Sequence, residues 1–153
     1  LLDITKQLVK ALKIDKYIIF KGKCSPQEVQ EILNNSRALV LHSVTPANLD
    51  REGTPNVVLE ASASALPIVA TKHEGIQDAV IHGETGFLVD ELDYLAMAKY
   101  INLLIQNPNL ADKLGKAGRN FMEKAYPLSK SMERLNSIIQ NSINSPDKIT
   151  KQE

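Results

Sequence analysis

The sequence has little of several features that would point to a specialised class of protein. Its 153 residues include a single cysteine, Cys24, so no internal disulfide can form and a reducing compartment fits. Its 18 basic and 18 acidic residues cancel, and the basic excess typical of a nucleic-acid-binding surface is missing. No apolar run approaches the roughly 18 residues that suggest a membrane-spanning helix. We therefore expect neither a nucleic-acid partner nor a membrane span.

The N-terminus has neither an initiator methionine nor a signal peptide, because Asp3 and Lys6 interrupt the apolar residues at once. We therefore expect a piece of a longer protein. The content of 43% hydrophobic and 24% charged residues is that of a soluble globular protein with a core of its own.

Short β-rich runs alternate with amphipathic stretches, which predicts an α/β fold with a parallel sheet. The predicted strands cover residues 17–20, 38–41, 67–71 and 87–89. The predicted helices cover residues 1–12, 26–34, 55–65, 76–81, 94–105, 110–125 and 128–141. We expect one domain over residues 1–142 and a disordered tail over residues 143–153.

The run from Glu52 to Glu60 contains two carboxylates and the start of a helix. Thr54 is the predicted cap, and Pro55 suits the first helical position. The N–H groups that follow lack acceptors within the helix, and with the helix dipole they form an anion site suited to a phosphate. These N–H groups belong to Asn56, Val57 and Val58.

The two carboxylates suit hydroxyl groups on either side of such a phosphate. Helical side chains lean toward the N-terminus, so Glu60 on the second turn can reach the same ligand and match the cis-diol of a ribose. Glu52 could accept from sugar hydroxyls, and Gly53 lets a ligand approach the backbone. Together these groups describe a nucleoside diphosphate-sugar. Two solvated glutamates at a chance spacing are the competing interpretation.

Four short motifs in this sequence match those of a known protein family. They are Glu-Gly-Thr-Pro with Leu-Glu-Ala (52–55 and 59–61), Leu-Pro-Ile-Val-Ala-Thr (66–71), Gly-Glu-Thr-Gly-Phe-Leu-Val (83–89) and Phe-Lys-Gly (20–22). Over about residues 14–139 the chain resembles the retaining glycosyltransferases of the GT-B fold, family 4, also called glycosyl transferases group 1. The implied fold is a Rossmann-like parallel sheet with flanking helices, an incomplete C-terminal half of the GT-B fold with a helical C-terminus.

The resemblance implies a role for each matching position. Glu52 would be catalytic, contacting the transferred sugar, and Glu60 would bind the ribose. Three further positions, Gly53, Asn56 and Val57, would offer backbone N–H groups to the sugar and the diphosphate, and Thr54 belongs to the same donor site. Gly22, Lys23 and Cys24 would line the nucleobase slot. The family needs no metal ion or other cofactor.

The resemblance also implies partners. The substrates would be a nucleotide-sugar donor and a glycan or lipid-linked acceptor, the latter bound by an N-terminal domain outside this chain. The loop Val44–Asp50 resembles that of enzymes building bacterial exopolysaccharides. A cytoplasmic location follows, including the cytoplasmic face of the membrane through peripheral association of the full-length protein.

Some positions depart from the family pattern. Residues 74–78 read Glu-Gly-Ile-Gln-Asp where Gly-Gly-Ile-Pro-Glu is usual, and the Arg and Lys that clamp the diphosphate would precede this segment. We interpret His42 and His73 as solvated side chains, and we expect the chain alone to be catalytically inactive. Two alternatives stay open: a non-catalytic nucleotide-sugar or protein-binding module, and a sugar epimerase of the GT-B fold.

Overall fold

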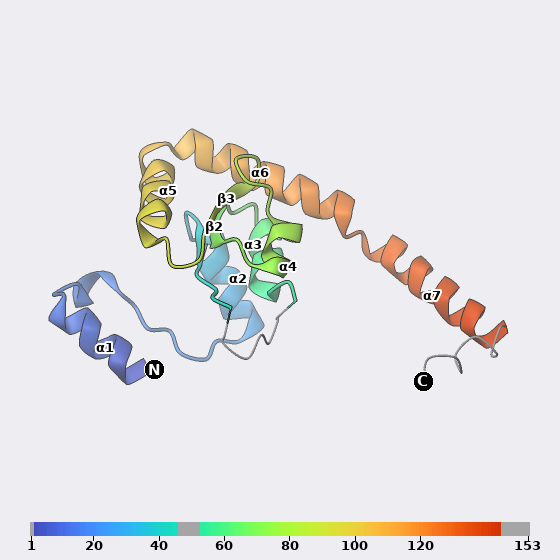
Figure 1. Ribbon diagram of the computed structural model, residues 1–153, viewed down its shortest axis with the longest axis horizontal. Coiled ribbons are helices and arrows are strands. Elements are labelled where there is room, and N and C mark those ends of the chain that lie inside the picture. The colour runs from blue at the N-terminus through green and yellow to red at the C-terminus, as the bar shows by residue number, and fades with distance from the viewer. Residues whose placement is uncertain (1, 46–52, 145–153) are drawn as a thin grey trace. The chain divides into compact units, whose positions relative to one another are not determined.

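A computed structural model describes residues 2–45 and 53–144 of the chain (Figure 1). The chain divides into two units, Leu1–Glu31 and Ile32–Glu153, which are described separately below. Within the described ranges, no helix is both long and apolar enough to cross a bilayer.

The first unit contains α1 (Leu2–Ala11), as predicted, but not the predicted strand over residues 17–20. Asp15–Tyr17 form a single 3-10 turn (η1), and the three residues after it have no regular structure. Ile19 is 79% exposed. A strand needs a neighbour for its backbone N–H and C=O groups, and no strand in the described part of the chain pairs with these residues.

A capping box opens α2 (Pro26–Asn34), confirming the predicted start. The Glu28 N–H donates to the Ser25 hydroxyl at 3.3 Å, and the Ser25 N–H donates to the Glu28 carboxylate at 2.7 Å. The bond from the Ser25 N–H to the carboxylate, together with hydrogen bonding by the Ser25 side chain, lowers the pKa of Glu28.

The second unit is built on three parallel strands in the order β1 (Leu39–Leu41), β2 (Ile68–Thr71) and β3 (Gly86–Val89). All three confirm predicted strands. Leu39 lies opposite Ile68, and Ile68 lies opposite Gly86. Every residue of β2 and β3 is buried, as expected for a parallel sheet covered on both faces, whereas β1 is partly exposed at the edge.

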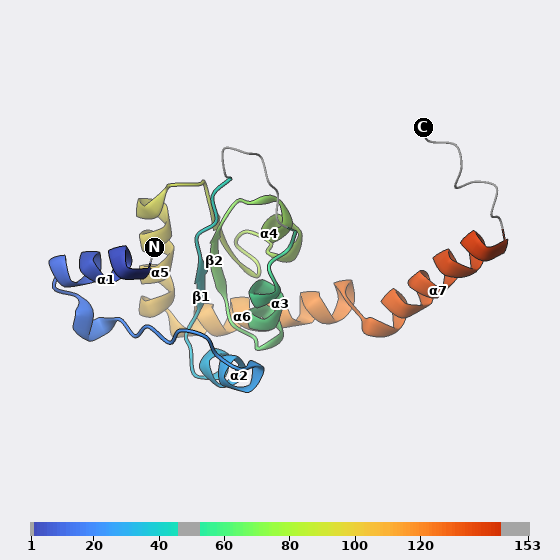
Figure 2. The ribbon, with the colours of Figure 1, turned by 90° about the horizontal axis from the view of Figure 1, so that it is seen from below.

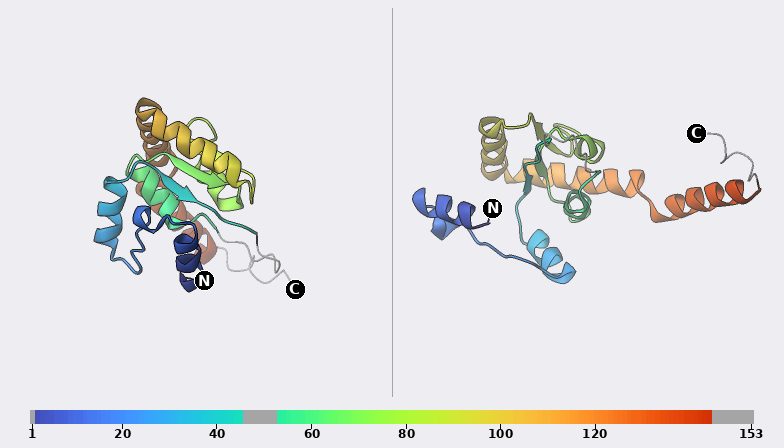
Figure 3. Two further views of the ribbon diagram at one scale, coloured as in Figure 1. Left: turned by 90° about the vertical axis from the view of Figure 1, so that its left-hand side faces the viewer. Right: turned by 60° about the horizontal axis from the view of Figure 1, so that its bottom comes forward.

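Helices cover both faces of the strands, with α5 (Tyr94–Gln106) on one side and α3 (Asn56–Ala63) on the other, as Figures 1 and 2 and the right-hand view of Figure 3 agree. The core on the α5 side also includes α6 (Pro108–Ala125). It consists of Val69, Phe87, Val89, Met97, Leu104, Ala111 and Leu114. The remaining helices are α4 (Glu74–Ala79) and α7 (Leu128–Asn144). Residues 145–153 of the predicted tail lie outside the described residues.

Helices α3 and α6 approach closely at a glycine. A Cβ atom on Gly115 would collide with the carbonyl oxygen of Ala65, just after α3. Ala65 has a positive φ of 56°, so its backbone is already in the restricted left-handed region. Gly118, one turn later on α6, is also buried, yet its Cβ would meet only ordinary contacts at 3.7 Å or more.

These two glycines give a matched pair of substitutions. We expect Gly115→Ala to lower the free energy of unfolding by about 1–3 kcal/mol, because backbone must move to admit the methyl group. Gly118→Ala should leave stability unchanged or raise it by up to about 1 kcal/mol, the helix-propensity gain of alanine over glycine. Urea unfolding of the two variants and the unsubstituted chain measures this. Equal stability of the two variants would contradict the proposed close approach.

Candidate functional site

The predicted anion site lies at the start of α3. The helix begins at Asn56 with Pro55 as its N-cap, one residue later than predicted. No side chain caps this end, so the prediction that Thr54 caps the helix is wrong. The Thr54 hydroxyl donates instead to the Gly75 carbonyl at 2.8 Å, because the first turn of α4 lies beside it.

Two of the three expected N–H groups are open at this terminus. The Val58 N–H donates to the Pro55 carbonyl at 3.0 Å, so the prediction that it is free is wrong. That bond closes an i→i−3 turn, which commonly tightens a helix end. The Asn56 and Val57 N–H groups have no acceptor among the described residues. Asn56 is exposed, so this end of α3 is accessible to an anion.

Gly75 holds the loop before α3 in place, a role that sequence reasoning missed. A Cβ on Gly75 would collide with the Thr54 nitrogen and the Gly53 carbonyl carbon, so only glycine allows the two segments to touch. Gly53 itself is exposed, and a Cβ there would meet nothing within 4 Å. The backbone at Gly53 is therefore open to a ligand on its outer side.

The other predicted site residues are placed as follows. Glu60 is exposed on α3, and its side chain makes no ion pair or hydrogen bond within residues 2–45 and 53–144. Glu52 lies outside the described residues, and its role stays a prediction. Gly22, Lys23 and Cys24 belong to the first unit. Gly22 has a positive φ of 69°, and the Cys24 thiol faces the Gly22 carbonyl at 3.9 Å. Their role in a nucleobase slot also stays a prediction.

The carboxyl ends of the three strands are joined by polar contacts. After β1, the Ser43 N–H donates to the Thr71 hydroxyl at 2.9 Å, and that hydroxyl donates back to the Ser43 carbonyl at 2.8 Å. Two residues further, the Thr45 N–H and hydroxyl both donate to the Glu91 carboxylate, at 2.9 and 2.7 Å. Glu91 follows β3, so its carboxylate links the loops after β1 and β3.

His73 completes this group. Its Nδ1 lies 3.4 Å from Oε1 of Glu91, and its side chain is only 8% exposed. The interpretation of His73 as a solvated side chain is therefore wrong, because it packs at the N-cap of α4 against the loop after β3. The sequence held one signal of this position, since His73 and Glu91 each stand two residues beyond a predicted strand. His42 is exposed, as expected.

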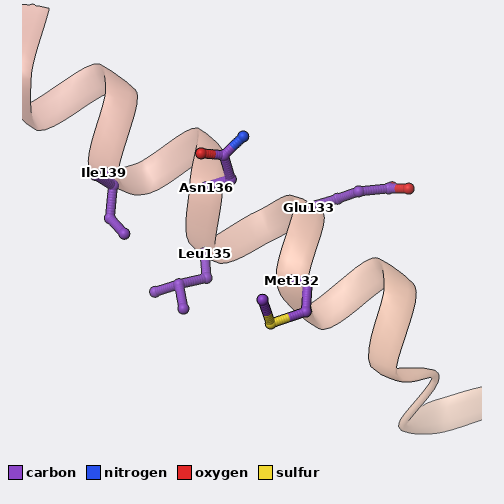
Figure 4. A pocket seen from close by; sticks show the side chains of 5 residues that line it. All are labelled: Met132, Glu133, Leu135, Asn136 and Ile139. Atoms are coloured by element: carbon purple, nitrogen blue, oxygen red, sulfur yellow. The ribbon is translucent and has the colours of Figure 1, made fainter.

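A surface hollow on α7 is a different kind of feature. Its lining residues all belong to that one helix. Figure 4 shows Met132, Leu135 and Ile139 pointing to one side of the helix, and Glu133 and Asn136 to the other. Side chains of a single helix cannot enclose a small molecule, so this hollow is not a candidate for the functional site.

The fold and the edge described above define a Rossmann-like α/β unit with an open helix N-terminus at the carboxyl ends of its strands. The family model described as glycosyl transferases group 1 matches residues 2–121. The chain therefore belongs to the glycosyl transferases group 1 family.

Three known proteins are similar to this chain in sequence or in fold. The capsular polysaccharide biosynthesis glycosyltransferase CapM of Staphylococcus aureus is 38% identical over 58% of this chain and 23% of its own length. Anabaena HepE, solved in complex with UDP-glucose, matches with a TM-score of 0.80 at 19% identity, over 92% of this chain and 36% of HepE. The C-terminal domain of a group 1 glycosyltransferase, LpcC of Francisella tularensis, matches with a TM-score of 0.69 at 27% identity, over 83% of this chain and 64% of that one.

These comparisons confirm the predicted fold: part of the C-terminal half of a GT-B glycosyltransferase. The chain spans about a quarter of the length of CapM and about a third of that of HepE. The two known proteins are thus much longer than the segment that the chain matches.

The glycine beside the site gives a second testable contrast. We expect Gly75→Ala to lower the free energy of unfolding by about 1–3 kcal/mol, because the methyl group would push the Gly53–Thr54 backbone away from α4. Gly53→Ala is the control, with no neighbour for its Cβ, and we expect a change below about 1 kcal/mol. Thermal unfolding of both variants measures the difference. A smaller loss for Gly75→Ala than for Gly53→Ala would contradict this packing.

The Glu91 carboxylate predicts a difference in stability that depends on pH. The bonds from the Thr45 backbone and hydroxyl, with a smaller contribution from His73, hold the pKa of Glu91 below its ordinary value of 4.5. A lowered pKa in the folded state stabilises the fold above pH 4.5, and this stabilisation is lost as the pH falls through the folded-state value. We expect unsubstituted protein to be more stable than Glu91→Gln at pH 7, with the gap closing toward pH 3.

The control for this contrast is Asp90→Asn. Asp90 pairs with Lys72 at 2.9 Å, but both side chains are largely exposed, so the pair contributes little. Chemical unfolding at both pH values compares the three proteins. A gap between Glu91→Gln and the unsubstituted protein that is the same at pH 7 and pH 3 would refute the assignment.

Proposed function

We propose that this chain is the donor-binding part of a retaining glycosyltransferase of family 4. The intact enzyme would transfer a sugar from a nucleoside diphosphate to a glycan or lipid-linked acceptor in polysaccharide biosynthesis. The observation that carries the proposal is the α3 N-terminus, where the Asn56 and Val57 N–H groups are open beside the exposed Gly53 and Glu60.

Each of these groups suits one part of the donor. Two free N–H groups at the positive end of a helix dipole match the charge of a diphosphate. An exposed carboxylate one turn later, without a partner in the described part of the chain, can accept from both hydroxyls of a ribose. The site also lies at the carboxyl ends of parallel strands, where open α/β sheets bind their ligands. HepE, whose structure contains UDP-glucose, shares this fold.

The proposed reaction follows from these positions. Glu52 would contact the transferred sugar as its bond to the diphosphate oxygen breaks. The acceptor oxygen would bond to the same carbon on the same face, and its proton would pass to the departing phosphate. The Arg and Lys that would precede this segment, together with the helix N-terminus, would neutralise the diphosphate, so we expect no metal ion to be needed. This chain alone, without an acceptor-binding domain, is expected to be inactive.

The location and the alternatives rest on the same reasoning. We propose a cytoplasmic enzyme, with peripheral association at the cytoplasmic face of the membrane when the acceptor is lipid-linked. A non-catalytic nucleotide-sugar or protein-binding module, or a sugar epimerase, would share the fold. A module would bind donors without turnover, whereas an epimerase would change the sugar without an acceptor.

Two glutamate variants test the proposal in the full-length protein that contains this chain. We expect Glu60→Gln to raise the dissociation constant for the nucleoside diphosphate about tenfold, because one of the two ribose acceptors is lost. Glu52→Gln should leave that constant unchanged and mainly lower turnover. Calorimetric titration with UDP-, GDP- and ADP-glucose, repeated in the presence of a chelator, measures binding, and release of the nucleoside diphosphate measures turnover.

The control is Glu84→Gln. Glu84 is exposed in the turn before β3, at the amino ends of the strands and so at the opposite edge of the sheet. We expect it to bind and turn over donor as the unsubstituted protein does. If Glu60→Gln and Glu52→Gln both match this control, the site is assigned wrongly. A loss of binding in the chelator would refute the metal-independent mechanism.

A further inference from the structure

The carboxylate of Glu91 has polar neighbours in two other loops. It accepts two hydrogen bonds from Thr45, one from the backbone and one from the hydroxyl, while His73 Nδ1 lies 3.4 Å from the same carboxylate. Each oxygen thus already has a donor close by. A carboxylate in this state is poorly placed to act as a general base, since proton uptake would break the bonds that hold it. Its contacts suit a structural role, in which the carboxylate holds the neighbouring loops together.

The contacts of Glu91 connect all three strand ends to the candidate donor site. Thr45 follows β1, His73 follows β2 and Glu91 follows β3. His73 is also the N-cap of α4, and two residues later Gly75 contacts the Gly53–Thr54 backbone that leads into α3. The position of Thr45 is thus coupled, through Glu91 and α4, to the backbone at the α3 N-terminus.

Burial distinguishes this contact from its neighbour. The Glu91 and His73 side chains are 30% and 8% exposed, so the contact between them is partly shielded from water. Lys72 and Asp90 join the same two loops, but at 48% and 76% exposure. An exposed pair of this kind is worth little, so of these two contacts the one between Glu91 and His73 contributes more to the arrangement of the loops.

We propose that Glu91, steadied by His73, is a positioning residue for the donor site, acting through Thr45 and α4 on the backbone that receives the diphosphate. This inference rests on the proposed function. It adds three residues, Glu91, His73 and Thr45, that do not themselves touch the donor. Their contribution is to hold Thr45, close after β1, and the start of α4 in the arrangement that the donor needs.

Variants of Thr45 test this proposal without endangering the core, since Thr45 is exposed. In the full-length protein, Thr45→Val removes the hydroxyl donor, and we expect the dissociation constant for the best-bound nucleoside diphosphate-glucose to rise about tenfold. Thr45→Ser keeps the hydroxyl and should restore the original affinity. Glu91→Gln should match Thr45→Val, and the double variant should be no weaker than the weaker single variant, because both remove one interaction. Asp90→Asn should bind within twofold of the unsubstituted protein.

Titration with UDP-, GDP- and ADP-glucose measures these affinities, and circular dichroism at the same temperature confirms an equal folded fraction. A merely structural contact would lower the folded fraction and leave the affinity of the folded protein unchanged, which would overturn the proposal. If the unsubstituted protein binds donor and Thr45→Val and Glu91→Gln bind it equally well, this inference fails and the proposed function stands. If the unsubstituted protein binds none of the three donors, the proposed donor site and this inference both fail.

Discussion

The parallel pairing of β2 with β1 on one side and β3 on the other is the constraint on which the second unit depends. Parallel strands have all their carboxyl ends at one edge of the sheet. After each strand the chain must therefore cross back to the opposite edge before the next strand begins. The strand pairing alone therefore places the loops that carry Ser43, His73 and Glu91 at the same edge, and contacts between the loops only add to this. Burial of β2 and β3 on both faces makes this arrangement rigid.

Two glycines allow close backbone contacts at the two ends of α3. Gly115 admits the backbone after α3, and Gly75 admits the loop before it, so both ends of α3 are located by contacts that a Cβ would prevent. As a result the α3 N-terminus is fixed in space while its first two N–H groups remain open. A binding site needs this combination, since groups held in place lose little freedom when a ligand arrives.

Most of the fold could be predicted from local patterns. The runs Leu39–Leu41, Ile68–Thr71 and Gly86–Val89 are apolar and bounded by turn residues, and Ser25 with Glu28 forms a capping box between near neighbours. The prediction failed at residues 17–20, where the apolar pattern of a strand is present but no partner strand pairs with it among the described residues. A helix can satisfy its backbone locally, whereas a strand cannot.

The sequence by itself determined the family, the three paired strands and the position of the helix end that is the candidate anion site, because each depends on residues close together in the chain. Only the tertiary structure decided how that end is supported. Thr54 bonds to Gly75 rather than capping α3, and His73 is buried against Glu91 rather than solvated. Thr45 and Glu91 are 46 positions apart, and no local pattern reports a contact that forms only when parallel strands bring their ends together.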